Sequence, residues 1–209
     1  MRLVIFGATG RTGRHLVEQA LGRGHEVTAF VRDPSKVRLF HERLSVVRGD
    51  VMEEGAVEEA ISGQEAVVSA IGHARGAPED VQTRGTANIV KAMKRHGVGR
   101  FVSLTGAGVR AEGDEPKVVD KVFGFLLKTL QRDVIEDAAN HVEVVRKSGL
   151  DWVIVRGPRL TEGEKKGEYR VGNVGKNSGT RISRADLAEF MLDQLTSDDY
   201  LHQMPVVSY

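Results

Sequence analysis

Apolar residues recur along the chain in short continuous runs that alternate with amphipathic stretches. Residues 3–6 read Leu-Val-Ile-Phe, without the polar alternation of a strand that has one wet face, and they predict a central strand of a parallel sheet. After a glycine-rich turn, the apolar residues of 16–21 share one helical face, and glycines at 22 and 24 end that helix. The chain therefore opens with a buried strand, a tight turn and an amphipathic helix.

The same alternation continues to the end of the chain. Asp33 followed by Pro34 predicts a helix start, and Ser183 with Asp186 is spaced as a capping pair. Alternating strands and helices predict an α/β fold of the Rossmann type, a doubly wound parallel sheet with helices on both faces. We expect the further strands at 27–31, 46–47, 66–71, 101–104, 152–155 and 204–207, and helices near 56–61, 80–96, 118–130, 134–145 and 187–195.

Residues 157–183 interrupt this pattern because they are polar and rich in glycine. They predict one short hairpin, with strands at 169–171 and 181–182. We interpret residues 1–209 as a single domain in which 157–183 and 203–208 form a small lobe on the substrate side.

Composition and charge narrow the class of protein. Among 209 residues, Lys+Arg number 30 and Asp+Glu 29, so no broad basic field favours nucleic acid. The chain has no cysteine, which excludes a disulfide scaffold, a thiolate metal site and a cysteine nucleophile. It contains neither an apolar run long enough to span a membrane nor a signal-peptide pattern. We therefore expect a cytoplasmic protein that binds neither membrane nor metal.

The segment Gly7-Ala8-Thr9-Gly10-Arg11-Thr12-Gly13 lies between the first predicted strand and the first predicted helix. In that position a glycine pattern is typical of a dinucleotide-binding loop, although a glycine-rich turn without a ligand is the alternative. Backbone N–H groups at a helix N-terminus reach a pyrophosphate where no side chain intervenes, which requires glycine. Thr9, Arg11 and Thr12 add donors for phosphate oxygens. A P-loop NTPase would need a lysine after Gly13, and position 14 is arginine.

The end of the second predicted strand indicates which cofactor is bound. An acidic residue there favours NAD, and an arginine favours the 2′-phosphate of NADP. The strand ends in Arg32, with Lys36 as a second cation. Asp33 argues for NAD, but its position before Pro34 gives it a role as a helix cap. We expect NADP(H) to be preferred over NAD(H).

Residues after the third and fourth predicted strands complete the candidate cofactor site. Asp50 and Val51 are placed to meet the adenine, although a simple strand-end turn is the alternative. The loop after the fourth strand lies where the strand order reverses, which is where such sheets bind a cofactor. In this loop Arg75 is expected to contact the cofactor, and a solvated surface charge is the alternative. The residues expected to line the pyrophosphate and nicotinamide there are Ile71, Gly72, His73 and Arg75.

These residues carry a resemblance to a known family. The chain resembles atypical short-chain dehydrogenase/reductases of the NmrA-like group, most closely the biliverdin-IXβ reductase/flavin reductase type. The resemblance implies NADPH in an extended pose, with an open apolar shelf for flavins or tetrapyrroles. The implied cofactor-binding residues are Thr9, Gly10, Thr12, Arg32, Lys36, Asp50, Val51, Gly72, His73 and Arg75. The shared motifs include Ile5 to Gly10, Val31-Arg32-Asp33, Gly49-Asp50-Val51, Asn88-Ile89-Val90, Ser148-Gly149-Leu150, Ile182-Ser183 and Asp186-Leu187.

The sequence departs from those reductases at two positions near the nicotinamide. After the fifth strand they carry a serine, and this chain has Thr105-Gly106 with glycine at the serine position. After the sixth strand they carry a histidine, and this chain has Arg159. We retain Thr105 and Arg159 as candidate cofactor contacts.

No catalytic acid is evident. Short-chain dehydrogenases pair a tyrosine with a lysine four residues later, which lowers the pKa of the phenol. The three tyrosines are Tyr169, Tyr200 and Tyr209, and none is followed by a lysine at that spacing. His73 and His141 are expected to have structural partners. The catalytic residues are therefore left unassigned.

Together these observations predict an NADPH-dependent reductase that transfers hydride to a flavin, tetrapyrrole or quinone-like acceptor, because that reaction asks the protein mainly to position two rings. The alternative is a non-enzymatic NADP(H) sensor of the NmrA-like type. A sugar-nucleotide epimerase ranks third because it also relies on a tyrosine and lysine pair. We expect a monomer or a weak homodimer.

Overall fold

The computed structural model describes residues 1–74, 76–115 and 132–209. Its main sheet contains β1 (Arg2–Phe6), β2 (Glu26–Val31), β3 (Leu44–Arg48), β4 (Ala66–Ser69), β5 (Arg100–Gly106), β6 (Asp151–Gly157), β8 (Arg170–Gly172) and β10 (Val206–Ser208). The order is β3-β2-β1-β4-β5-β6-β10-β8. The first seven strands in this order pair in parallel, and β8 runs antiparallel to β10. This order, 3-2-1-4-5-6 over its first six strands, confirms the predicted doubly wound Rossmann fold.

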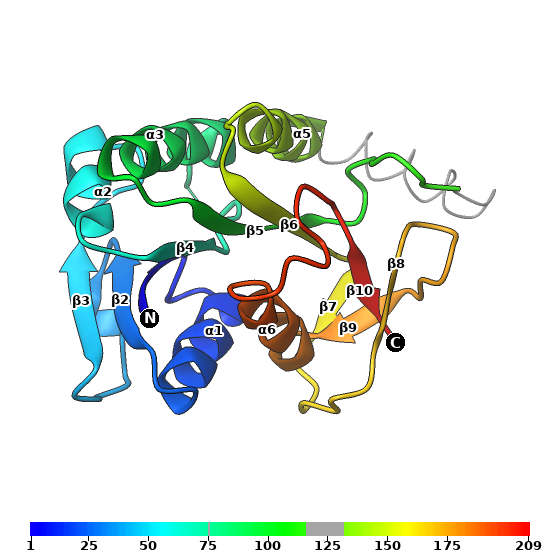
Figure 1. The fold of residues 1–209 in the computed structure, drawn as a ribbon, viewed down its shortest axis with the longest axis horizontal. Coiled ribbons are helices and arrows are strands. Elements are labelled where there is room, and N and C mark those ends of the chain that lie inside the picture. The colour runs from blue at the N-terminus through cyan, green and yellow to red at the C-terminus, as the bar shows by residue number, and fades with distance from the viewer. Residues whose placement is uncertain (75, 116–131) are drawn as a thin grey trace.

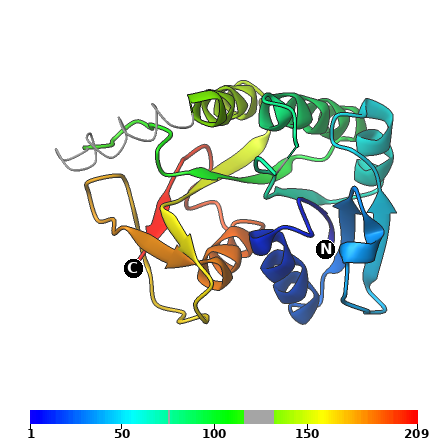
Figure 2. The same ribbon diagram turned by 180° about the vertical axis from the view of Figure 1, so that it is seen from behind.

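Helices cover both faces of the sheet (Figures 1 and 2). One face carries α1 and α6, and the other carries α2, α3 and α5 (Figure 1). The helices are α1 (Arg11–Gly22), α2 (Glu54–Ile61), α3 (Val81–His96), α5 (Arg132–Arg146) and α6 (Arg184–Asp193), with a 3-10 turn, η1, at Pro34–Lys36.

The unbroken apolar run of β1 follows from this two-sided cover. Leu3 and Ile5 belong to the core beneath α1 and α6, whereas Val4 and Phe6 belong to the core beneath α2, α3 and α5. All four side chains are fully buried. Because successive side chains of a strand point to opposite faces, a strand packed on both sides needs apolar residues at every position.

One prediction of local structure is wrong, and the helix start predicted at Asp33-Pro34 is found but carries only a short helix. The hairpin expected in 157–183 does not form, because β8 pairs with β10 in the main sheet, whereas β9 (Arg181–Ser183) pairs in parallel with β7 (Arg159–Thr161). The pattern of apolar residues marked these short strands but not which distant strand each would join. The helix expected after Asp33 is limited to η1, because Val37 is already extended and the chain beyond it offers no apolar stripe to bury.

The other expected elements are found, with ends that shift by a few residues. The fourth strand ends at Ser69 rather than at residue 71, so Ile71 lies in the loop that follows. Ser183 and Asp186 do form a capping pair: the Ser183 hydroxyl accepts a hydrogen bond from the Asp186 N–H at 3.0 Å. The helix expected at 118–130 lies outside the described residues. No helix in the described part of the chain is both long enough and apolar enough to cross a membrane.

Candidate functional site

The loop between β1 and α1 leaves no room for side chains. Gly7 has a φ of +75°, and a Cβ there would lie 2.6 Å from the carbonyl oxygen of Ala70. A Cβ on Gly13 would lie 2.0 Å from the carbonyl oxygen of Gly7. Both glycines are therefore required by the geometry, as the sequence predicts. Because Ala70 follows β4, the first contact also joins the loop to the point where the strand order reverses.

The N-terminus of α1 is open toward this loop. Gly10 is the N-cap residue, and no described side chain caps the helix there. The first turn carries no acidic residue. Uncapped N–H groups with a helix dipole behind them form a ready site for an anion, and a side-chain-free approach suits a pyrophosphate.

The residues after β2 are arranged as expected for a cap and two cations. Asp33 accepts a hydrogen bond from the Ser35 N–H at 3.1 Å and another from the Ser35 hydroxyl at 2.7 Å. These bonds and the neighbouring Lys36 lower the pKa of the Asp33 carboxyl. Lys36 lies 3.7 Å from Asp33, and Arg32 is exposed. The carboxylate that argued for NAD is therefore engaged in capping η1.

A cavity of about 260 Å³ lies beside the phosphate loop. Three of its lining residues are cationic, namely Arg14, Lys36 and Arg38, and one is acidic, Glu18. Arg14 is fixed by a hydrogen bond from its Nε to the carbonyl oxygen of Thr9, at 3.2 Å. The remaining lining residues are Ala8, Thr9, Val17, Ala29, Val37 and Leu39. The cavity therefore combines the loop, the start of α1 and the segment after β2 into one positively charged recess.

After β3, Asp50 forms a local turn, the alternative left open by the sequence. One carboxylate oxygen, Oδ1, accepts a hydrogen bond from the Met52 N–H at 3.0 Å. Val51 is held from α3, because Asn88 donates to its carbonyl oxygen at 2.9 Å and its methyl groups pack where a Cβ on Gly85 would lie. These contacts hold Asp50 and Val51 in place between the end of β3 and helix α3.

After β4, His73 is bound to the core rather than free. Its Nε2 lies 2.8 Å from Oδ2 of Asp137 on α5. The same oxygen accepts a hydrogen bond from the Gln82 N–H, and Oδ1 accepts one from the Thr83 N–H. This structural partner was expected. Ile71 is half-buried and Gly72 is exposed, whereas Arg75 lies outside the described residues.

The ends of β5 and β6 hold the residues at which the sequence departs from flavin reductases. Thr105 is 5% exposed, and its hydroxyl has no hydrogen-bond partner among the described residues. Next to it, Gly106 is exposed, with open space where a Cβ would project. Arg159, on β7, is also exposed and lies beside Arg181 in the sheet register. An orphaned buried hydroxyl at the carboxyl end of a central strand is a group that a bound ligand would satisfy.

Comparison with known proteins identifies the family. A family model described as NAD(P)H-binding matches residues 7–198. The chain belongs to this NAD(P)H-binding family. It is also 31% identical, over 83% of its length, to an uncharacterized chloroplastic protein of Arabidopsis thaliana, of which it spans 62%.

Two solved structures of similar fold are described as a dehydrogenase/reductase and a reductase. One is the short-chain dehydrogenase/reductase of Veillonella parvula in complex with NADP, with a TM-score of 0.81, 22% identity and coverage of 100% of this chain and 94% of that one. Another is ChuY, an anaerobillin reductase of Escherichia coli O157:H7, with a TM-score of 0.82, 18% identity and coverage of 100% and 97%. The predicted membership of an NAD(P)H-binding family is confirmed by the family model, and these two structures confirm the fold.

In this family member, Tyr169 and Tyr209 are not prepared for acid catalysis. Burial raises the pKa of Tyr169 to about 12. Burial and the adjacent Asp186 carboxylate also raise the pKa of Tyr209, whose hydroxyl donates to that carboxylate. A catalytic tyrosine of the dehydrogenase type needs the opposite change. Ser103 and His141 are hydrogen-bonded at 2.8 Å but are almost fully buried, so this pair cannot meet a substrate.

Sequence reasoning missed two groups at this end of the sheet. Arg14 and Arg38 line the charged cavity. They could have been found from their positive charge and from their position in the sequence, next to the loop and soon after the second strand. The other group is a buried ion pair, in which Arg156 donates to both oxygens of Asp114 at 2.7 and 2.9 Å. Arg156 sits inside an apolar strand, and nothing in the sequence indicates its partner.

Proposed function

We propose that the protein is an NADPH-dependent reductase that transfers hydride to a flavin or a similar conjugated acceptor. The observation that carries this proposal is the continuity between the side-chain-free phosphate loop and the cavity lined by Arg14, Lys36 and Arg38. A loop open to a pyrophosphate, joined to a recess of positive charge, suits a cofactor that carries one more phosphate than NAD.

The residues present fit that cofactor. Gly7 and Gly13 form a cradle that a Cβ would fill, and the hydroxyl of Thr105 lacks a partner among the described residues. The cofactor-binding set that we propose is Gly7, Thr9, Gly10, Arg11, Thr12, Gly13, Arg14, Arg32, Lys36, Arg38, Asp50, Val51, Ile71, Gly72, His73, Arg75, Thr105 and Arg159. In this set, His73 contributes through its fixed loop, because its ring is bound to Asp137. Arg11 contributes its backbone N–H at the first turn of α1, because its guanidinium pairs with Glu162.

The preference for NADP rests on charge. Arg32 and Lys36 follow β2, and Arg14 and Arg38 line the adjacent cavity. Asp33, the residue that would favour a ribose hydroxyl, caps η1 instead. The complex of a structural neighbour with NADP is consistent with this preference.

The assignment of a flavin-like acceptor rests on the lack of a tyrosine with a lowered pKa among those whose pKa is shifted. When bound, the cofactor supplies a hydride. The chain's own task is then to hold the cofactor and position a flat acceptor, since Tyr169 and Tyr209 have raised rather than lowered pKa values. An electron-poor ring that takes its proton from water needs no more than this. The reductase activity named for ChuY supports the same class of reaction.

Steady-state oxidation of NADPH and NADH against FMN, FAD, riboflavin, quinones and a tetrapyrrole tests the proposal. We expect turnover with NADPH well above that with NADH. Arg32→Glu should raise the Kd of NADPH about tenfold more than that of NADH, since it replaces a charge-assisted contact with repulsion. Arg95→Glu, on the distant helix α3, is the control and should change neither.

Two results would contradict the proposal. Equal losses for both cofactors in Arg32→Glu would refute the NADP preference. Tight NADPH binding without acceleration by any acceptor would favour the non-enzymatic sensor, which the lack of an activated tyrosine suits equally well.

A further inference from the structure

Two arginines meet one carboxylate oxygen beside the start of α1. Arg184, the first residue of α6, has its Nη1 2.8 Å from Oε1 of Glu162. Arg11, the first residue of α1, has its Nη1 3.5 Å from the same oxygen. Two helix N-termini and two guanidinium groups therefore converge where the phosphate loop meets the segment that follows β7.

Burial in this cluster is unequal. The side chain of Arg184 is 8% exposed, whereas those of Glu162 and Arg11 are 60% and 75% exposed. Burial and the nearby Arg11 lower the pKa of Arg184, and Glu162 opposes that change. A cation removed from water needs an anion beside it, whereas an exposed carboxylate loses little when its ion pair opens. The cation is therefore the fixed member of the pair and the anion the exchangeable one.

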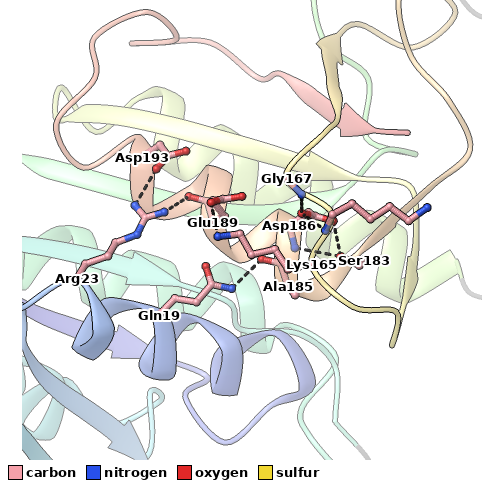
Figure 3. Close-up of polar contacts among 10 residues, drawn as sticks. Gln19, Arg23, Lys165, Gly167, Ser183, Ala185, Asp186, Glu189 and Asp193 are labelled. Carbon is pink, nitrogen blue, oxygen red and sulfur yellow. Dashed lines mark hydrogen bonds and ion pairs between the residues drawn. The ribbon is translucent and has the colours of Figure 1, made fainter.

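The capping turn of α6 fixes this arrangement. Asp186 is fully buried and accepts hydrogen bonds from the N–H groups of Lys166 and Gly167, at 3.0 and 2.8 Å, and from the Ser183 hydroxyl at 2.8 Å (Figure 3). These bonds anchor the chain a few residues beyond Glu162 to the same helical turn that carries Arg184. The guanidinium is thus held by the fold, while Glu162 reaches it from an exposed loop.

Arg184 retains donors for a ligand. Among the described residues, its side chain donates to Glu162, which takes one of its N–H groups. None of its nitrogens is both fully buried and unpaired, so the remaining N–H groups reach solvent. A planar guanidinium that presents an open edge beside a second arginine suits bidentate binding of a carboxylate or a phosphate.

We propose that Arg184 and Arg11 form an anion subsite for the acceptor, in which a carboxylate or phosphate of the acceptor replaces Glu162. This inference rests on the proposed reductase function, and it narrows the substrate to conjugated acceptors that carry an acidic group. Exchange of one anion for another keeps Arg184 paired throughout, so the buried charge is never left alone. In the absence of an acceptor, Glu162 serves as the internal counterion.

FMN and riboflavin test this proposal because they differ by one phosphate. Quenching of flavin fluorescence, measured on protein saturated with NADP⁺, gives their affinities without turnover. We expect FMN to bind at least about tenfold more tightly than riboflavin, as expected for one charge-assisted contact. Arg184→Gln should bring the ratio of the two affinities close to one, with little change in the Kd of riboflavin. Glu162→Gln should increase the ratio. Arg95→Gln removes an exposed arginine that pairs with Glu58 on the other face, and should leave the ratio unchanged.

Each other outcome has a defined meaning. A wild-type ratio near one overturns the subsite. If Arg184→Gln weakens NADP⁺ and leaves the flavin ratio intact, the arginines hold the cofactor's pyrophosphate and the proposal is wrong. If Arg184→Gln does not fold, Arg11→Gln, at an exposed position, must lower the ratio. If neither flavin binds, the flavin assignment fails separately, and inorganic phosphate decides: it must raise the Tm of the NADP⁺-saturated wild type and not that of Arg184→Gln.

Discussion

His141 should make the free energy of unfolding of this protein fall as the pH drops from 6.5 to about 4. The ring lies between α5 and β5, 2% exposed, with Nε2 bonded to the Ser103 hydroxyl at 2.8 Å. No described residue bonds its Nδ1. Burial lowers the pKa of His141 from 6.5 to about 4, so the ring stays neutral in the folded protein near neutral pH.

The sign and size follow from linkage. Below pH 6.5 the unfolded chain binds a proton at this ring and the folded protein does not, so acid favours unfolding. The stability is complete above pH 6.5 and is lost progressively down to about pH 4, the pKa of the folded protein. At about 1.4 kcal/mol for each tenfold difference in proton affinity, the separation of the two pKa values amounts to about 3 kcal/mol.

Urea unfolding between pH 7.5 and 4 measures this effect. His141→Gln removes the titrating group but keeps a side chain that can bond Ser103. We expect the variant to be less stable at pH 7 and to lose about 3 kcal/mol less than the wild type across the window. Hydrogen bonds lower the pKa of Asp137 although burial opposes them, so acid also weakens the contribution of that carboxylate. Asp137 is present in both proteins, so its contribution cancels from the difference between their slopes. Equal slopes for wild type and variant would refute the reasoning.

Three further predictions concern the loop, the buried ion pair and the cofactor phosphate. Gly13→Ala should lower the unfolding free energy by about 1–3 kcal/mol and abolish NADPH binding, because its Cβ meets a backbone carbonyl at 2.0 Å, whereas Gly22→Ala meets nothing within 4 Å and should do neither. Asp114→Asn should cost about 3–5 kcal/mol in urea unfolding, because it leaves the fully buried Arg156 without a counterion; a loss below about 1 kcal/mol would contradict this. Arg14→Gln should raise the Kd of NADPH about tenfold and that of NADH by less than twofold in fluorescence titrations.

The sequence predicted the parts of the fold that local rules determine. An apolar run such as 3–6 has to be covered on both faces, and a loop such as 7–13 has to lack side chains, wherever they lie in the molecule. Asp33 and Ser183 were predictable as caps because a cap bonds to its own next turn.

Contacts between distant segments were not predictable in this way. β8 joins the main sheet by pairing with β10, and β9 joins a second sheet by pairing with β7. The local sequence pattern does not indicate either partner. The pairing of Arg156 with Asp114, and the approach of Glu162 to Arg184, likewise depend on how strands and loops far apart in the chain are brought together. The partner of a single charged residue cannot be predicted from its own position in the sequence.

Amide chemical shifts recorded during a titration with NADPH test the central claim most directly. The account predicts saturable binding, with the largest changes at the N–H groups of residues 7–13 and further changes at Arg14 and Arg38. Absence of binding at saturating NADPH, or binding that leaves the amides of residues 7–13 unchanged, would contradict it.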